Sequence, residues 1–281
     1  MSDKKLTIVA GPTAVGKTAF AIELAKKLDS PIISADSRQV FKELNIGVAR
    51  PSEEQLSEVK HYLIAHTSIH QPYNAGVFAK EARMIINQLF EKHDNLVVCG
   101  GTGLYIKALI NGFDPLPPSN EILRQELEEN YASLGIEFLQ EKLKSLSVDL
   151  YNKTEILNPQ RLIRAIEIGS AEEVPVSDIP DFSWEFETEY KVLTMDRNEL
   201  YDRINRRVDE MVEMGLEKEA KDLEEFQELN ALQTVGYSEW WPYFRGENKI
   251  EFTIDKIKQH SRNYAKRQET WFKHQLIKSN S

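Results

Sequence analysis

Residues 11–18 read Gly11-Pro12-Thr13-Ala14-Val15-Gly16-Lys17-Thr18, and this stretch decides the fold. It matches the phosphate-loop pattern G-x-x-x-x-G-K-[ST] at every required position. The apolar run Leu6–Ala10 before it predicts a buried strand, and the spacing in Ala19–Leu28 after it predicts a helix. Between a strand and a helix, the backbone N–H groups of such a loop bind phosphate oxygens. In this pattern the lysine supplies a cation and the Thr18 hydroxyl can ligate Mg²⁺.

The motif alone does not say what happens to the phosphates. Read by itself, it suggests ATP or GTP, and a purely structural glycine turn is the alternative. The function must therefore be sought in the rest of the chain.

The composition of the 281-residue chain is that of a globular protein, with 28% charged residues and no apolar run as long as a membrane span. The opening residues lead directly into the first strand, which predicts no signal peptide. The single cysteine, Cys99, excludes an intramolecular disulfide, and no Cys/His cluster indicates zinc. We therefore expect a cytoplasmic protein that does not associate with membranes.

Charge is distributed unevenly along this chain, whose net charge is −10. Residues 256–273 hold six basic side chains against the single acid Glu269. On a helix, one face would carry Lys258, Arg262, Lys266 and Lys273. The two interpretations are a surface that binds a polyanion and a solvated helix face.

Strand and helix patterns alternate through the first 110 residues. After the first unit, strands are predicted at 31–35, 62–65 and 96–99, and helices at 76–90 and 104–110. A proline cluster at 114–118 interrupts the alternation, and residues 119 to about 170 show only helical patterns. A strand returns at 190–195, and the helices predicted after it span 198–214, 215–228, 238–244 and about 254–275.

This order of elements predicts an α/β fold, in which a P-loop-type parallel sheet is flanked by helices and carries an all-helical insertion domain. The predicted boundaries are 1–118 for the first part of the core, 119–185 for the insertion and 186–281 for the second part of the core.

In an open parallel sheet, ligands bind outside the carboxyl ends of the strands. Three loops meet that condition, namely the phosphate loop, residues 36–39 and residues 100–103. A carboxylate at Asp36 could hold Mg²⁺ through water or act as a general base, and a helix N-cap is the alternative. The loop 100–103 fails as a dinucleotide fingerprint because it lacks the third glycine, so it either faces the ligand or is a tight turn.

The helix predicted at 160–167 has two faces. Its apolar side carries Leu162, Ile163 and Ile166, while Gln160, Arg161 and Arg164 share the opposite side. Such a polar face could grip a nucleic-acid backbone, and a plain amphipathic helix is the alternative.

Six blocks of the chain, in order, resemble the bacterial tRNA dimethylallyltransferases, also called tRNA isopentenyltransferases. The blocks are Gly11–Thr18, Ser34–Val40, Gly100–Tyr105, Gln160–Ala165, Gln233–Tyr237 and Arg262–Phe272. Together they extend over nearly the whole chain, which makes the resemblance far more specific than a phosphate loop alone.

The resemblance implies a prenyl transfer. Dimethylallyl diphosphate would donate its dimethylallyl group to the exocyclic amine of the adenine that follows the tRNA anticodon on its 3′ side. The phosphate loop would then hold a leaving diphosphate together with Mg²⁺, and the adenine would be flipped out of its loop. The family gives the removal of the amine proton to the residue that matches Asp36.

The resemblance also implies a role for each matching residue. The diphosphate would be bound by Gly11, Pro12, Thr13, Ala14, Val15, Gly16, Lys17 and Thr18, with Thr18 as the Mg²⁺ ligand. Catalysis would fall to Asp36, Lys17, Thr18 and Lys221. Contacts with tRNA would come from Asp36, Ser37, Arg38, Gln39, Thr102, Arg124, Gln160, Arg161, Leu162, Ile163 and Arg164. The insertion domain would bind the anticodon arm, and we expect the protein to be a monomer.

Two positions depart from the family pattern. Several relatives place an arginine that contacts the diphosphate where this chain has Lys221, which keeps the charge but lacks the bidentate guanidinium. Ser238 stands where a basic residue is common, and the zinc finger of eukaryotic members is absent from the sequence.

Three other functions are compatible with parts of the pattern. They are prenylation of a free adenine nucleotide, phosphate transfer by a small-molecule kinase with the same loop, and RNA binding around a relict phosphate site. The helical insertion and the basic segment argue against the first, because a free nucleotide needs neither. The presence of Lys17, Thr18 and Asp36 argues against the last.

Overall fold

The structure is a computed structural model that describes residues 4–112, 117, 119–171 and 179–277. The chain divides after Gly112 and before Ile179 into two compact units. We call the part that holds both ends of the chain the core unit and the part between these positions the insertion unit. The sequence placed these boundaries six or seven residues later, at 118/119 and 185/186.

The core unit is built on a five-stranded parallel sheet in the order β3-β2-β4-β1-β5. The strands are β1 (Lys5–Ala10), β2 (Ile32–Ser34), β3 (His61–Tyr62), β4 (Asn95–Gly100) and β5 (Glu187–Val192). The central strands are apolar along most of their length, and Leu6, Ile8 and Val97 are fully buried. Such continuous apolar runs form because helices cover both faces of a parallel sheet.

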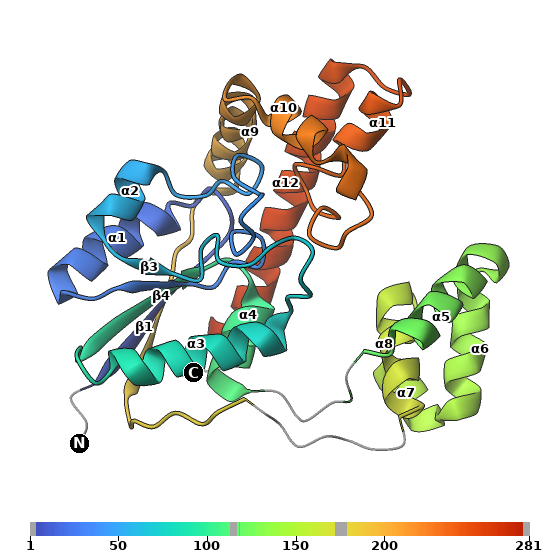
Figure 1. The fold of residues 1–281 in the computed structure, drawn as a ribbon, viewed down its shortest axis with the longest axis horizontal. Coiled ribbons are helices and arrows are strands. Elements are labelled where there is room, and N and C mark those ends of the chain that lie inside the picture. Colours follow the sequence, from blue (N-terminus) through green and yellow to red (C-terminus); the bar gives the residue numbers. More distant parts are fainter. Residues whose placement is uncertain (1–3, 113–116, 118, 172–178, 278–281) are drawn as a thin grey trace. The chain divides into compact units, whose positions relative to one another are not determined.

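Helices lie on both sides of this sheet (Figure 1). One side carries α1 (Lys17–Leu28) and α2 (Glu53–Glu58), and the other carries α3 (Ala75–Leu89) and α4 (Gly103–Asn111). The predicted N-cap of α3 is confirmed, since the Asn74 side chain accepts hydrogen bonds from the N–H groups of Gly76 and Val77. The strand order and right-handed crossovers together require this arrangement, because the chain moves toward one edge through α1 and toward the other through α3.

Two strand predictions were wrong in their bounds. The strand expected at 62–65 ends at Tyr62, because Leu63 and Ala65 adopt positive φ angles of 61° and 48°, which a strand cannot contain. The strand expected at 190–195 is β5, which begins and ends three residues earlier. This edge strand is half-buried and contains Glu and Lys side chains, so its apolar pattern is weak.

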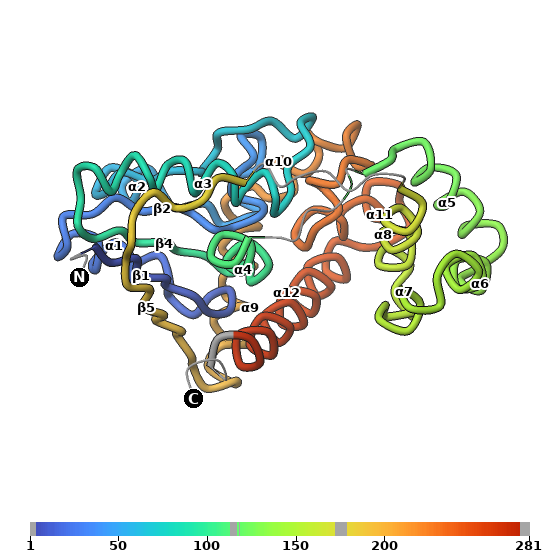
Figure 2. The backbone as a smooth tube through the Cα atoms, turned by 90° about the horizontal axis from the view of Figure 1, so that it is seen from below, coloured from blue at the N-terminus to red at the C-terminus, as the bar shows by residue number. Residues whose placement is uncertain are grey.

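The remainder of the core unit is helical, as predicted. It comprises α9 (Arg197–Glu213), α10 (Leu216–Asp222), a 3₁₀ turn (Glu224–Phe226), α11 (Trp240–Phe244), α12 (Ile250–Phe272) and a π-helical turn (Lys273–Ile277). The helix expected at 215–228 is thus divided into α10 and the 3₁₀ turn. The long α12 is seen along much of its length in Figure 2. It packs on α9 and closes a core around the fully buried Tyr237 and Trp240.

Arg83 ties together the two positions where the core unit borders the insertion. This side chain of α3 is buried, and its guanidinium donates to the carbonyl oxygens of Leu109 and Ile110 at the end of α4. It also donates to the carbonyl of Pro180, 3.1 Å away, where the chain returns. The buried charge therefore satisfies carbonyl groups that the last turn of a helix leaves unpaired.

The insertion unit is a small helical domain with a core of its own. Its helices are α5 (Glu121–Leu134), α6 (Ile136–Leu146), α7 (Val148–Lys153) and α8 (Pro159–Gly169). The predicted start of α8 is confirmed, with Pro159 at its first position and the Asn158 side chain accepting from the N–H of Arg161. Leu127, Leu139 and Leu143 pack there without exposed surface. No helix in the described part of the chain is long and apolar enough to cross a membrane.

Candidate active site

The site lies where β1 and β4 sit side by side at the centre of the sheet. The connections that follow these two strands leave toward opposite faces, which opens a crevice at their carboxyl ends. A cavity of about 1160 Å³ occupies this place. It is lined by the phosphate loop, the loop 36–39 and the end of β4, and also by α9, α12 and the segment 45–52. The structure thus brings the phosphate loop, which its motif identified, together with the loop 36–39 and the end of β4, to which only their positions in the sheet pointed.

The phosphate loop has the geometry that its motif predicts. Gly16 has a φ of 101°, in the left-handed region that glycine adopts without steric cost, and α1 begins at the next residue. Val15 anchors the loop by packing against Leu200 and Ile204 of α9. The Nζ atom of Lys17 donates to the carbonyl of Pro12 at 2.7 Å.

Burial lowers the pKa of Lys17, while the neighbouring Cys99 and Asp36 act in the opposite direction. The ammonium is thus a partly desolvated cation, and an anion placed beside it would interact with it more strongly than in water.

Asp36 caps a turn and still faces the cavity. Its Oδ1 atom accepts from the N–H groups of Arg38 at 2.9 Å and Gln39 at 3.2 Å, so the carboxylate caps the turn of residues 37–40 rather than a helix. Because both hydrogen bonds use Oδ1, the Oδ2 atom is the oxygen available for a proton from a ligand. The capping interpretation and the functional one therefore apply to different oxygens of one side chain.

The two residues after Ser37 have their side chains engaged within the protein. The guanidinium of Arg38 donates to the carbonyl of Asn230 at 2.8 Å, and the amide of Gln39 donates to the carbonyls of Val48 and Ala49. Both line the cavity, where they hold its wall together.

Thr102 contacts the loop that carries Asp36. It is the N-cap of α4, yet its hydroxyl makes no capping hydrogen bond. Instead it accepts from the N–H of Ser37 at 3.1 Å and donates to the Ser37 hydroxyl at 3.3 Å. Burial raises the pKa of Tyr264 to about 12, Asp36 adds to the rise and a hydrogen bond with Thr102 opposes it. An N-cap hydrogen bond contributes about 1 kcal/mol to helix stability, and Thr102 does not make one. Its hydroxyl instead connects two loops of the site.

Helix α9 contributes arginines that the sequence analysis missed. Arg207 is partly buried and donates to the Thr13 hydroxyl at 3.2 Å and to the carbonyl of Ala49 at 3.4 Å. Burial lowers its pKa and the carboxylate of Asp36 raises it. Arg203, one turn earlier, lies against Gly16 and also lines the cavity. The sequence did contain a signal for them, because Arg203 and Arg207 are four residues apart and therefore lie on one face of a helix.

Lys221 lies apart from this cavity. Its Nζ atom pairs with Glu224 at 2.5 Å and sits 4.6 Å from the centre of the Phe244 ring, and the side chain is more than half exposed. It is not among the residues that line the cavity. The structure therefore does not bring Lys221 to the phosphate loop, where the resemblance placed it.

In the insertion unit, the residues expected to bind tRNA divide into three groups. Leu162 and Ile163 have no exposed surface and belong to the core, so their assignment to the RNA surface is corrected. Gln160 and Arg161 are exposed, with Arg161 pairing with Glu155 at 2.5 Å.

Arg124 and Arg164 both pair with the fully buried side chain of Glu167, at 2.7 and 3.4 Å. Burial alone would raise the pKa of Glu167, but hydrogen bonds from Arg124 and Ser119 and the charge of Arg164 hold it below its usual range. Glu167 also accepts from the N–H of Asn120, so this carboxylate joins α8 to the start of α5.

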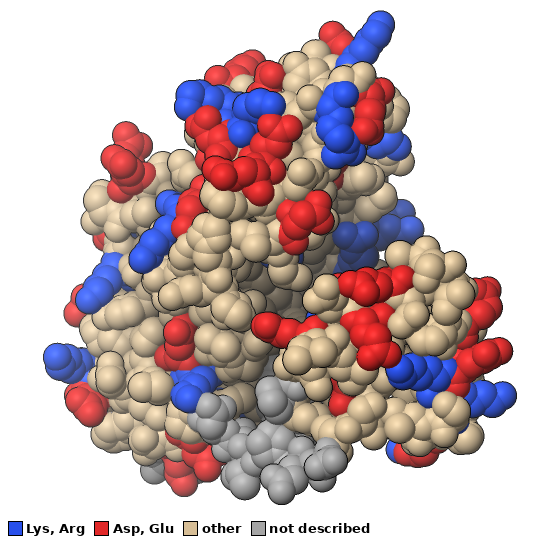
Figure 3. Space-filling view, turned by 45° about the vertical axis from the view of Figure 1, so that its right-hand side comes forward, with Lys and Arg blue, Asp and Glu red and all other residues tan. Residues whose placement is uncertain are grey.

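Two of the four residues of the basic face expected on the last long helix are internal. Lys258 pairs with Asp209 at 2.5 Å and Arg262 donates to Asn205 at 2.6 Å, so both face α9 rather than solvent. Acidic and basic side chains are mixed at the end of the molecule that carries α9 to α11, uppermost in Figure 3.

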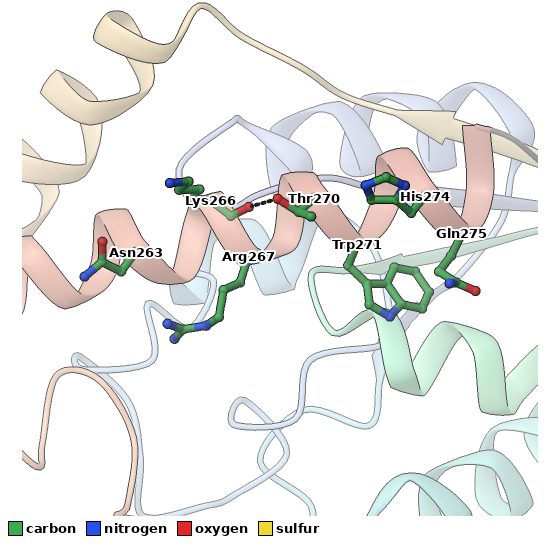
Figure 4. Close-up of a pocket in the computed structure, with 7 residues that line it drawn as sticks. All are labelled: Asn263, Lys266, Arg267, Thr270, Trp271, His274 and Gln275. Carbon is green, nitrogen blue, oxygen red and sulfur yellow. Dashed lines mark hydrogen bonds between the residues drawn. The ribbon is translucent and has the colours of Figure 1, made fainter. Parts of the chain in front are cut away.

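The other two residues of the expected face, Lys266 and Lys273, are exposed near the C-terminal end of α12. A hollow of about 570 Å³ is lined there by Asn263, Lys266, Arg267, Thr270, Trp271, His274 and Gln275 (Figure 4). Arg267 and Trp271 project on the same side of the helix, and Trp271 lies against Gly103 of α4.

Among the residues that the structure describes, no group of three or more His, Cys, Asp or Glu side chains could hold a metal ion by itself. Thr18 and Asp36 both line the cavity beside the phosphate loop. This donor set suits Mg²⁺, which keeps several waters and is completed by oxygens of a bound phosphate ligand.

The sheet order, the phosphate loop at its switch point and the cationic cavity define a P-loop-type protein with a site for a phosphorylated ligand. A family model described as IPP transferase matches residues 39–275, and the chain belongs to this family.

Relatives from bacteria agree with this assignment. The chain is 44% identical to a tRNA dimethylallyltransferase from Cytophaga hutchinsonii, with 96% of this chain and 90% of the relative covered. It is 43% identical to one from Flavobacterium johnsoniae with the same coverage.

Solved structures are similar as well. A tRNA isopentenylpyrophosphate transferase from Bacillus halodurans matches with a TM-score of 0.70 and 36% identity, over 97% of this chain and 88% of that chain. A eukaryotic dimethylallyltransferase acting on tRNA matches with a TM-score of 0.79 and 26% identity, over 98% of this chain and 71% of that chain.

Proposed function

We propose that this protein transfers a dimethylallyl group from dimethylallyl diphosphate to the exocyclic amine of the adenine 3′-adjacent to the tRNA anticodon, and releases diphosphate. The observation that carries the proposal is one cavity that unites the phosphate loop, Asp36 and the neighbouring Ser37. It occurs in a chain that is 44% identical to a relative named tRNA dimethylallyltransferase.

The diphosphate half of the reaction falls to the cations around the phosphate loop. As the carbon–oxygen bond of the donor breaks, negative charge grows on the departing oxygen. Lys17, Arg207 and the N-terminus of α1 would stabilise that charge from partly desolvated positions. We assign the guanidinium contact to Arg207 rather than to Lys221, because Arg207 hydrogen-bonds to Thr13 of the loop. Mg²⁺, held by Thr18 and the diphosphate, would supply further charge neutralisation when bound.

The acceptor half falls to Asp36. The amine nitrogen forms the new bond to the allylic carbon, and one of its protons must leave. The Oδ2 atom of Asp36 would accept that proton while Oδ1 remains bound to the turn N–H groups of Arg38 and Gln39. Thr102 and Ser37, joined by their hydroxyls, would lie beside the adenine.

Contacts with the rest of the tRNA would come from exposed polar residues. In the insertion unit these are the exposed Gln160 and Arg161, together with the partly exposed Arg124 and Arg164, which pair with Glu167. In the core unit, Lys266 and Arg267, which line the hollow on α12, are suited to contacts with phosphate groups. Flipping the target base costs a few kcal/mol, and least where the base is already unpaired, as in an anticodon loop.

Mass spectrometry of an anticodon stem-loop incubated with the protein, Mg²⁺ and dimethylallyl diphosphate tests the proposal. We expect one added dimethylallyl group on the adenine next to the anticodon. Prenylation of AMP but not of the stem-loop would favour the free-nucleotide alternative. Tight ATP binding with phosphate transfer would favour a kinase, and RNA binding without any product would favour a binding protein.

Two further expectations from the sequence stay predictions. We propose that the protein acts as a monomer, which size-exclusion chromatography with light scattering tests. Its location in the cytoplasm follows from the proposed substrate and awaits localisation in cells.

A further inference from the structure

A buried glutamine on α12 joins two loops of the cavity. Gln268 is only 7% exposed, and both ends of its amide are used. Its Oε1 atom accepts from the N–H of Thr13 in the phosphate loop at 2.8 Å. Its Nε2 atom donates to the carbonyl of Gly101 at 2.8 Å. One side chain thus bridges the loop after β1 and the loop after β4.

The bridge is sterically matched to its surroundings. A Cβ atom at residue 101 would lie 2.4 Å from the Nε2 atom of Gln268, so only glycine permits this approach. A buried amide is costly unless its groups are paired, and an apolar side chain would satisfy a buried helix face more simply. Because both ends of the amide are hydrogen-bonded, we infer that the amide fixes the position of one loop relative to the other.

The two bridged loops belong to different halves of the proposed reaction. Thr13 is part of the loop that would hold the diphosphate, whereas Gly101 precedes Thr102, whose hydroxyl holds Ser37 beside Asp36. Tyr264, one helical turn before Gln268, also lines the cavity. Helix α12 therefore supports both the donor side and the acceptor side through Gln268.

We propose that Gln268 is a positioning residue that sets the distance between the donor loop and the acceptor loop. This inference rests on the proposed prenyl transfer. Attack on the allylic carbon requires the reacting atoms to lie about 3–3.5 Å apart and aligned. Both ends of the Gln268 amide are engaged by Thr13 and Gly101, so this side chain acts mainly on the distance between the loops, and its loss should lower the rate of the chemical step more than the affinity for the substrates.

The test compares Gln268→Met with the wild type and with the control Gln259→Met. Methionine has a similar volume but makes neither hydrogen bond, and Gln259 is an exposed residue of the same helix that does not line the cavity. For Gln268→Met we expect kcat to fall about 10–100-fold, with KM for dimethylallyl diphosphate and for the stem-loop within about threefold of wild type. The control should match the wild type.

Amide hydrogen exchange on the same proteins tests directly whether Gln268 holds the two loops together. We expect faster exchange in Gln268→Met for the peptides that contain Thr13 and Thr102. Gln268→Asn, which keeps the amide but is too short to span both loops, should show the same loss of kcat and gives a second measurement if the methionine variant fails to fold.

Three results would overturn the inference. They are a kcat within twofold of wild type, a loss expressed only in the KM for the donor, and unchanged exchange in both peptides. A wild-type protein that transfers no dimethylallyl group would instead reject the proposed function and this inference with it, so the two failures are distinguishable.

Discussion

Replacing the partly buried Arg207 by methionine should separate ligand binding from stability. Arg207 donates two hydrogen bonds, to Thr13 at 3.2 Å and to Ala49 at 3.4 Å, both at the long end of the usual range. Burial lowers its pKa, which means that the fold disfavours its charge relative to water. Methionine would lose the two weak hydrogen bonds but also the cost of burying the charge. We expect the free energy of unfolding to change by less than about 1.5 kcal/mol.

Binding of diphosphate should respond far more strongly. A hydrogen bond to a charged group contributes about 1.5–3 kcal/mol, which corresponds to about a 10–150-fold change in the dissociation constant. Isothermal titration of pyrophosphate with Mg²⁺ would measure this loss, and urea unfolding would measure stability. Arg197→Met is the matched control, because Arg197 is an exposed residue of the same helix and does not line the cavity.

Two outcomes would refute the reasoning for Arg207. Pyrophosphate affinity within twofold of wild type would show that the guanidinium does not reach the ligand. A loss of more than about 3 kcal/mol of unfolding free energy would show that Arg207 mainly stabilises the fold.

Three further substitutions give separate readouts. Asp36→Asn should lower the single-turnover rate by about 10²–10⁴-fold with stem-loop affinity retained, and a rate within threefold of wild type would remove Asp36 as the base. Glu167→Gln, which breaks the buried pairing with Arg124, should destabilise the insertion unit by about 1–3 kcal/mol at pH 7. Because the pKa of Glu167 is lowered by folding, its contribution is present above the ordinary glutamate pKa of about 4.3 and is lost as pH falls through the lower folded value. The difference between variant and wild type in thermal unfolding should therefore shrink below about pH 4, and a constant difference would contradict the assignment. Arg161→Ala should weaken stem-loop binding and reduce the salt slope by about 0.7, whereas an unaltered slope would place the RNA elsewhere.

Local patterns predicted most of the helices and the inner strands. The caps at Asn74 and Asn158 and the strands β1 and β4 depend on a few neighbouring residues or on burial from both sides. The predicted bounds of the edge strand β5 were three residues too late. The half-exposed side chains of this strand give a weak apolar pattern, and its register is set by pairing with β1.

In the candidate site, too, some residues could be predicted from the sequence and the positions of others could not. Asp36 could be selected because it follows a strand of a parallel sheet, where ligands bind. Lys221 was selected through the resemblance, and the structure places it against Glu224 and Phe244. Lys258 and Arg262 share one face of α12, as their spacing indicated, but the spacing could not show that this face packs against α9.

By itself, the sequence determined the phosphate loop, the parallel α/β core, the helical insertion and the family, because each depends on short-range patterns or on ordered blocks of residues. Only the tertiary structure decided that Arg207 and Gln268 reach Thr13 and that Gln268 also reaches Gly101. These contacts join residues more than 150 positions apart, and their geometry follows from how α9 and α12 pack on the sheet rather than from any local preference of the chain.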